Sequence, residues 1–134
     1  MPLPLRRLHH LAIISADYPR SLHFYTHILG LTLRAEHYRA ERQSYKADLA
    51  LGDTYDGDLF SFPSPPPRPS YPEAAGLRHL AFEVDDIEAS SRYLDRRGIS
   101  HEPIRTDPYT GLRFLFLADP DGLPIELYEK ESPQ

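Results

Sequence analysis

The sequence predicts an α+β fold of two βαβββ modules, related by internal duplication, whose mixed sheet curls around a concave face. Three observations carry this prediction. The chain has 134 residues, the size of one compact domain. A histidine, a glycine and an acid–leucine–aromatic triplet recur in the same order in both halves. Each half also reads as one strand, one helix and three more strands.

The repeat has nearly constant spacing. From His10 to Gly30 is 20 positions, and from His79 to Gly98 is 19. Two matching triplets, Asp58-Leu59-Phe60 and Glu126-Leu127-Tyr128, begin 48 and 47 positions after the two histidines. Two copies of this length favour an internal duplication over a solenoid.

Local signals place the elements within each half. Asp17 is a typical N-cap, Pro19 fits the first helical turn, and Gly30 fits a left-handed C-cap. The second helix opens at Asp85 or Asp86 and ends before Gly98, with Ile87, Ser91 and Leu94 on one face, as Leu22, Tyr25 and Leu29 are in the first. The predicted strands are 8–14, 31–37, 44–51 and 57–62, then 78–84, 100–105, 113–118 and 123–129.

We predict a single domain over residues 1–134. Module one covers about 5–62, a proline-rich linker 63–75, module two about 76–130, and a short tail 131–134. Six prolines between Pro63 and Pro72 favour an extended, stiff connector. A proline-rich recognition ligand is the alternative interpretation of this stretch.

Composition excludes several classes of function. The formal net charge is −5, which argues against a nucleic-acid binder. The absence of cysteine excludes disulfides, thiolate metal sites and cysteine nucleophiles. No apolar run has membrane-spanning length and the N-terminus lacks a signal-peptide core, so we expect a soluble cytoplasmic protein without a membrane partner.

The alternation of side chains along strands predicts a metal cleft. His10 and His79, each followed two positions later by an alanine, point to the concave face, as do Asp58 and Glu126. Two imidazoles and two carboxylates suit Zn, Ni, Fe or Mn. Hydrogen-bonded structural histidines are the alternative. The other histidines do not recur, and we interpret them as structural or solvated, with His9 on the helix side: His9, His23, His27, His37 and His101.

The sequence resembles the vicinal oxygen chelate superfamily of glyoxalase I, bleomycin resistance proteins and extradiol dioxygenases. The resemblance covers about Leu5 to Glu129. It is carried by His10-Leu-Ala-Ile with Asp17, Phe24-Tyr25 through Leu29-Gly30, His79-Leu-Ala-Phe with Asp85, and Asp119-Pro-Asp-Gly-Leu-Pro-Ile-Glu126-Leu. It implies a divalent metal held by His10, Asp58, His79 and Glu126, and a glyoxalase-like lyase or isomerase.

In that chemistry the metal stabilises an enediolate-like charge and a carboxylate moves a proton between adjacent carbons. The resemblance assigns this general base to Glu126, with Asp58 as second candidate. Two positions depart from glyoxalase I: Ile14 replaces an arginine and Phe62 an asparagine, both used for glutathione. Asp58 also stands where glyoxalase I has a longer glutamate, so its direct ligation is an open question.

Substrate contacts are predicted in the loop 105–113, where Arg105, Tyr109 and Arg113 offer hydrogen-bond donors to an anionic group. The segment Arg42–Lys46 is a second candidate for such contacts, with weaker support from the sequence. Glu83 is an auxiliary acid or a solvated residue. Three alternatives stay open: a ring-cleaving dioxygenase with a triad of His10, His79 and Glu126, a thiol transferase of the fosfomycin-resistance kind, and a drug-binding protein without metal chemistry. A small-molecule substrate and a homodimer are expected.

Overall fold

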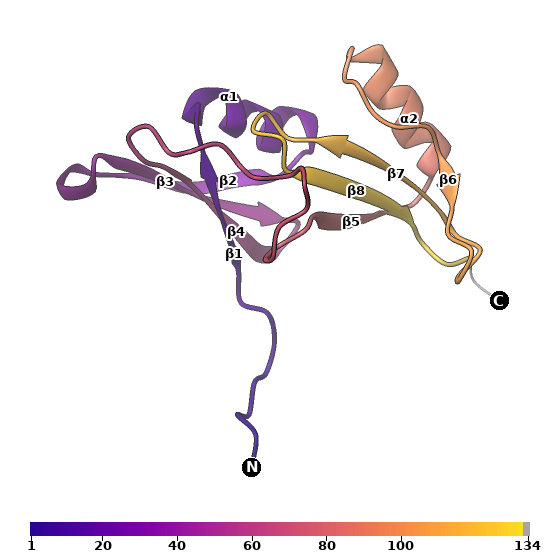
Figure 1. The fold of residues 1–134 in the computed structure, drawn as a ribbon, viewed down its shortest axis with the longest axis horizontal. Coiled ribbons are helices and arrows are strands. Elements are labelled where there is room, and N and C mark those ends of the chain that lie inside the picture. The colour runs from indigo at the N-terminus through magenta and orange to yellow at the C-terminus, as the bar shows by residue number, and fades with distance from the viewer. Residues whose placement is uncertain (133–134) are drawn as a thin grey trace. The chain divides into compact units, whose positions relative to one another are not determined.

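A computed structural model describes residues 1–132, apart from the side chains of residues 54–56. The chain forms two compact units, residues 1–67 and a second unit that begins at Arg68. Each unit contains a four-stranded mixed sheet, in the order β1-β4-β3-β2 in the first and β5-β8-β7-β6 in the second. The first pair of each sheet is parallel, and the other pairs are antiparallel. This confirms the predicted α+β class and the repeated βαβββ order (Figure 1).

The first unit contains strands β1, β2, β3 and β4 and one short helix, α1. A π-helical turn continues α1, and a 3-10 turn joins β2 to β3. The bounds are β1 Leu11–Ser15, α1 Tyr18–His23, the π turn Phe24–Ile28, β2 Thr32–Arg39, the 3-10 turn Ala40–Arg42, β3 Ser44–Leu51 and β4 Thr54–Ser61.

The first helix begins as predicted but continues differently. The Asp17 carboxylate accepts a hydrogen bond from the Arg20 N–H, which confirms the N-cap. The predicted α-helical spacing is wrong from Phe24 onward, where the Leu29 N–H donates to the Phe24 carbonyl, five residues back. Phe24 and Tyr25, the first two residues of this turn, are both buried.

The second unit repeats the plan with a regular helix, whose N-cap is Asp86, one of the two predicted candidates. The bounds are β5 Leu80–Val84, α2 Ile87–Arg96, β6 Arg105–Thr106, β7 Arg113–Ala118 and β8 Pro124–Glu129. The Asp119 carboxylate accepts the backbone N–H groups of Asp121 and Leu123, so the predicted turn before β8 forms around a buried acid.

One face of each sheet forms a core, and the other stays open. In the first unit Ala47, Leu49 and Leu59 are buried on the helix side. In the second unit the buried set is Leu80, Ile87, Leu94, Leu115, Leu117, Leu123, Ile125 and Leu127. Ala12, Ile14, Ala81 and Glu83 are exposed on the opposite faces, as strand alternation predicted. The open face of each sheet therefore carries the strand residues that alternate with the buried ones.

Three predicted strands are wrong by three residues or more at one end, and one of them is β4, which begins at Thr54 instead of Gly57. The first strand, β1, begins at Leu11 instead of Leu8, and residues 1–10 form an exposed extended segment (Figure 1). The predicted strand 100–105 shrinks to β6, Arg105–Thr106. The preceding residues are held by side-chain contacts instead, because His101 lies between the Asp95 carboxylate at 2.8 Å and the Glu102 carbonyl at 2.7 Å.

This His101 contact predicts a pH-dependent stability. The hydrogen bond to the Glu102 carbonyl, followed by the Asp95 interaction, raises the pKa of His101 above its ordinary value. A raised folded pKa gives a stabilisation that is complete below about pH 6.5 and is lost as the pH rises through the folded value. We expect the free energy of unfolding in urea to fall more between about pH 6 and about pH 8.5 in the wild type than in His101→Gln.

His37→Gln is the matched control, because His37 is an exposed histidine of β2. Its pH profile should follow that of the wild type. A profile of His101→Gln identical to that of the wild type would contradict the prediction.

Candidate metal centre

The first unit brings His10 and Asp58 together. His10 directly precedes β1, and Asp58 lies in β4, opposite Ala12 in the parallel register. The His10 Nε2 is 3.6 Å from the Asp58 Oδ2. The Asp58 side chain is only 5% exposed, whereas that of His10 is 42% exposed. The pair lies on the open face, where Ala12 leaves space between the two larger side chains.

The second unit repeats this arrangement with His79 and Glu126. His79 precedes β5, and Glu126 of β8 is opposite Ala81. The His79 Nε2 is 3.4 Å from the Glu126 Oε1. The two units therefore place a histidine and a carboxylate in the same relation, each carboxylate opposite the alanine two positions after the histidine.

The spacing within each pair fits a shared divalent ion. Donors about 2.1 Å from one ion are about 3.0 Å apart at an octahedral angle and about 3.4 Å apart at a tetrahedral one. The separation of 3.4 Å in the second pair equals the tetrahedral value, and the 3.6 Å of the first pair slightly exceeds it. Each unit contains one such pair, and among the described residues no three His, Asp or Glu side chains gather so that they could hold a metal ion. Each pair by itself thus has the composition and approximate spacing of two ligands of a divalent ion.

Two residues around the first pair make contacts that the sequence did not predict. The Lys46 Nζ is 3.3 Å from the Asp48 Oδ1 and 4.0 Å from the Asp58 Oδ2. His9 was expected on the helix side, but it is exposed and its Nδ1 lies 2.8 Å from the His10 Nδ1. A partner on Nδ1 orients the imidazole so that Nε2 faces the carboxylate. The adjacent His9-His10 pair was the only sequence signal for this contact.

The second pair lies beside an aromatic side chain. Phe116 of β7 is opposite Glu126 in the register, and the His79 ring packs edge-on against it at 5.1 Å. The His79 Nδ1 is buried and has no hydrogen-bond partner among the residues that the structure describes. The two histidines are therefore oriented differently, one by a neighbouring imidazole and the other by packing.

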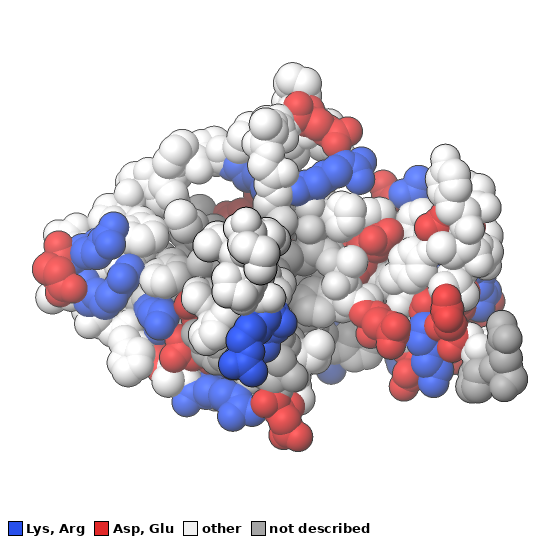
Figure 2. All heavy atoms as spheres, turned by 90° about the horizontal axis from the view of Figure 1, so that it is seen from below, with Lys and Arg blue, Asp and Glu red and all other residues white. Residues whose placement is uncertain are grey.

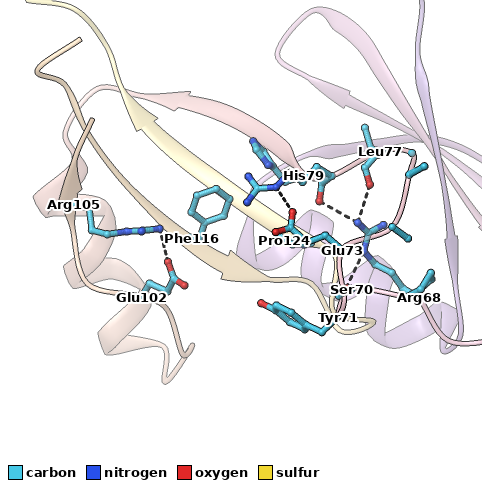
Figure 3. Close-up of a pocket in the computed structure, with 15 residues that line it drawn as sticks. Arg68, Ser70, Tyr71, Glu73, Leu77, His79, Glu102, Arg105, Phe116 and Pro124 are labelled. Carbon is cyan, nitrogen blue, oxygen red and sulfur yellow. Dashed lines mark hydrogen bonds and ion pairs between the residues drawn. The ribbon is translucent and has the colours of Figure 1, made fainter. Parts of the chain in front are cut away.

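A cavity of about 490 Å³ in the second unit is lined by His79. Figure 3 shows Arg105 and Glu102 on one side and Glu73 and His79 on the other, with Phe116 between them. The Arg78 guanidinium, which also lines the cavity, donates to Glu73. Residues 68–78 form a wall of this cavity, so the second half of the predicted linker belongs to the second unit. The Arg68 guanidinium fixes this wall by donating to the carbonyls of Leu77 and Arg78.

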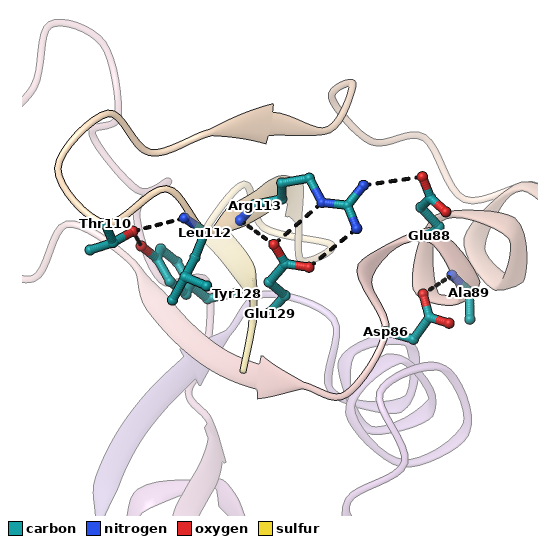
Figure 4. Close-up of polar contacts among 8 residues, drawn as sticks. All are labelled: Asp86, Glu88, Ala89, Thr110, Leu112, Arg113, Tyr128 and Glu129. Carbon is teal, nitrogen blue, oxygen red and sulfur yellow. Dashed lines mark hydrogen bonds and ion pairs between the residues drawn. The ribbon is translucent and has the colours of Figure 1, made fainter. Parts of the chain in front are cut away.

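The three predicted substrate residues have different surroundings. Arg105 lines the cavity, and its guanidinium lies over the Phe114 ring at 5.0 Å. Tyr109 is 95% exposed in the loop after β6. Arg113 pairs with Glu129 of β8 and Glu88 of α2 (Figure 4).

The loop itself is fixed by Tyr128. Its hydroxyl donates to the Asp107 carboxylate and also contacts the Thr110 hydroxyl, as Figure 4 shows in part. Tyr128 follows Glu126 by two residues in β8, so the two side chains lie on the same face of the sheet. A tyrosine of the open face thus holds the loop that follows Arg105, a contact that strand alternation alone did not predict.

Charge is mixed on the surface. On the face drawn in Figure 2, basic and acidic side chains are interspersed and form no continuous basic area. Within the described residues no helix is long and apolar enough to cross a membrane.

The chain belongs to the Glyoxalase/Bleomycin resistance protein/Dioxygenase superfamily, whose model matches residues 7–127. It is 58% identical to the uncharacterized protein YaeR of Escherichia coli, over 96% of this chain and 99% of that one. It is similar to the crystal structure of a glyoxalase family protein from Enterococcus faecalis, with 43% identity, a TM-score of 0.86, and coverage of 95% and 100%. A "probable lactoylglutathione lyase" of Vibrio cholerae is 28% identical, over 94% and 92% of the two chains.

Proposed function

We propose that the protein is a divalent-metal-dependent, glyoxalase-like lyase or isomerase. Its metal ligands in this proposal are His10, Asp58, His79 and Glu126, which bind Zn, Ni, Mn or Fe. The observation that carries the proposal is the repeated histidine–carboxylate pair, with the same strand register and separations of 3.6 and 3.4 Å. A drug-binding protein without metal chemistry would not need a histidine–carboxylate pair at the same position of both modules.

The bound metal would act as a Lewis acid toward two neighbouring oxygens of a small substrate. Glu126 then serves as the general base that moves a proton between adjacent carbons, with Asp58 as the second candidate. Two features support this order. Glu126 is 15% exposed, whereas Asp58 is 5% exposed and shares its Oδ2 with His10 and Lys46. Glu126 is therefore the more accessible of the two carboxylates to a bound substrate.

The cavity supports a substrate with an anionic group. Arg105 holds such a group in this proposal, because it lines the same cavity as His79. Tyr109 and Arg113 stay predictions for this role, and Arg113 would have to leave two carboxylates to fulfil it. Glutathione is a poor candidate, since Ile14 is 54% exposed and apolar at a position where glyoxalase I has an arginine.

The remaining predictions complete the proposal. The protein acts in the cytoplasm, as a homodimer and on a small molecule, and the grouping of both modules into one domain stays a prediction. An extradiol-type dioxygenase with the triad of His10, His79 and Glu126 is the second candidate. The ion pair between Lys46 and Asp58 favours it, because it gives that carboxylate a partner other than a metal.

The test is metal loading followed by two assays. Protein depleted with a chelator is reconstituted with Zn, Ni, Mn or Fe(II), and bound metal is measured by atomic emission. We expect a stoichiometric ion that is lost in His79→Ala and kept in the control His37→Ala. Proton exchange into dihydroxyacetone or the hemithioacetal of methylglyoxal, followed by NMR, tests the isomerase. Absence of a stoichiometric ion contradicts the proposal, and ring cleavage of catechol without proton exchange replaces it by the dioxygenase.

A further inference from the structure

Two arginines of the first unit converge on one pair of phenylalanines. The Arg39 guanidinium, at the end of β2, lies 4.9 Å from the Phe60 ring centre and 5.8 Å from that of Phe62. The Arg42 guanidinium, in the following turn, lies 5.5 Å from the Phe62 ring centre. The two rings are nearly parallel, with centres 6.0 Å apart. Two cations thus share one aromatic surface.

Neither of these guanidiniums has a carboxylate partner within the described part of the chain. Arg39 donates one hydrogen bond, to the Ser44 hydroxyl at 3.0 Å, and its Nε is buried without a partner. The Arg42 guanidinium has the contact with the Phe62 ring and no hydrogen bond or ion pair with another described side chain. The acids of the same face, Asp48 and Asp58, are engaged by Lys46. This differs from the second unit, where Arg78, Arg105 and Arg113 each pair with a glutamate.

The two guanidinium groups lack a negative charge to balance them among the described residues. Two like charges beside one ring repel each other unless an anion lies between them, and an unsatisfied buried donor calls for a partner. A guanidinium stacked on a ring still presents its N–H groups at its edge, in the fork that binds carboxylate and phosphate oxygens.

We propose that Arg39 and Arg42, supported by Phe60 and Phe62, form an oxyanion-binding site. Its ligand is a carboxylate or phosphate group of a small molecule. The site needs no metal, because it consists of these four side chains. It also differs from the Arg105 side of the cavity, which belongs to the second unit.

The position of the oxyanion site on β4 indicates which molecule carries the bound anionic group. Phe60 follows Asp58 by two residues on the same face of β4, a distance of about 7 Å along a strand. An anion bound there would lie beside the His10–Asp58 pair. We therefore assign it to the anionic end of the substrate; this assignment rests on the proposed function, whereas the anion site itself does not.

The test uses metal-depleted protein, so that its result does not depend on the metal site. Inorganic phosphate and acetate are titrated separately, and the Nε–Hε NMR signals of the arginines are followed. We expect the Arg39 signal to shift with saturation, and Arg42→Gln and Arg39→Lys to weaken binding at least about tenfold. The tighter of the two probes identifies the natural group as phosphate or carboxylate, and either result supports the site.

Arg20→Gln is the matched control, because it removes the same charge from an exposed position of the first unit. It should change the affinity less than about twofold. Equal weakening in all three variants, or an Arg39 signal that does not move, would overturn the proposal. Thermal unfolding of each variant confirms that it is folded, and Arg42→Gln disturbs no hydrogen bond. Intact metal binding in Arg42→Gln separates this result from a failure of the proposed metal site.

Discussion

Replacing Glu126 by Gln is expected to lower the affinity for the proposed divalent metal by about two orders of magnitude and to abolish the proposed isomerase activity. Zinc sites with four ligands bind with about 10 to 16 kcal/mol, so one ligand accounts for about 3 kcal/mol, or about a hundredfold in affinity. Gln keeps the size of the side chain but removes its charge and its ability to accept a proton. Competition with a chelating dye measures the affinity, and proton exchange measures the activity.

Asp58→Asn provides the comparison. Lys46 lies 4.0 Å from the Asp58 carboxylate, and its ammonium competes with a metal for that charge. We therefore expect a smaller loss of metal affinity in Asp58→Asn than in Glu126→Gln. Equal metal affinity in Glu126→Gln and in the wild type contradicts the assignment of Glu126 as a ligand. A larger loss in Asp58→Asn would reverse the order of the two carboxylates.

Replacing Ile125 by Ala is expected to destabilise the protein by about 2 to 5 kcal/mol, the range measured for cavity-forming changes of large aliphatic residues. Ile125 is fully buried in β8, opposite Leu80 of β5 and Leu117 of β7. Truncating its side chain to a methyl group leaves a cavity in the core on the buried face of the sheet. Urea unfolding at constant pH gives the free energy, with the slope of the transition as a check on two-state behaviour.

Ile125→Val is the graded control, for which about 0.5 to 1.5 kcal/mol is expected. Glu83→Ala, at an exposed position of the neighbouring strand, should change stability by less than about 0.5 kcal/mol. A cost in Ile125→Ala no larger than that in Glu83→Ala would show that β8 is not part of the core. Because Glu126 follows Ile125, reduced metal affinity in Ile125→Ala would link core packing to the position of the ligand.

The sequence by itself was sufficient for the features that repeat or that depend on neighbours along the chain. The duplicated spacing predicted two βαβββ modules, and strand alternation placed the buried Leu59 and Leu127 on the helix side. The N-caps Asp17 and Asp86 follow from local hydrogen bonding. These features are predictable because each is set by residues only a few positions apart, or by a pattern present twice.

The tertiary structure decided which side chains meet across strands. The contacts of Lys46 with Asp58, of Arg39 with Phe60 and of Tyr128 with Asp107 join residues 12 to 21 positions apart. The π turn at Phe24 and the cavity wall that begins at Arg68 also escaped prediction. The physical reason is the same in each case. Such contacts depend on strand register and on the reach of long side chains, which local propensities do not encode.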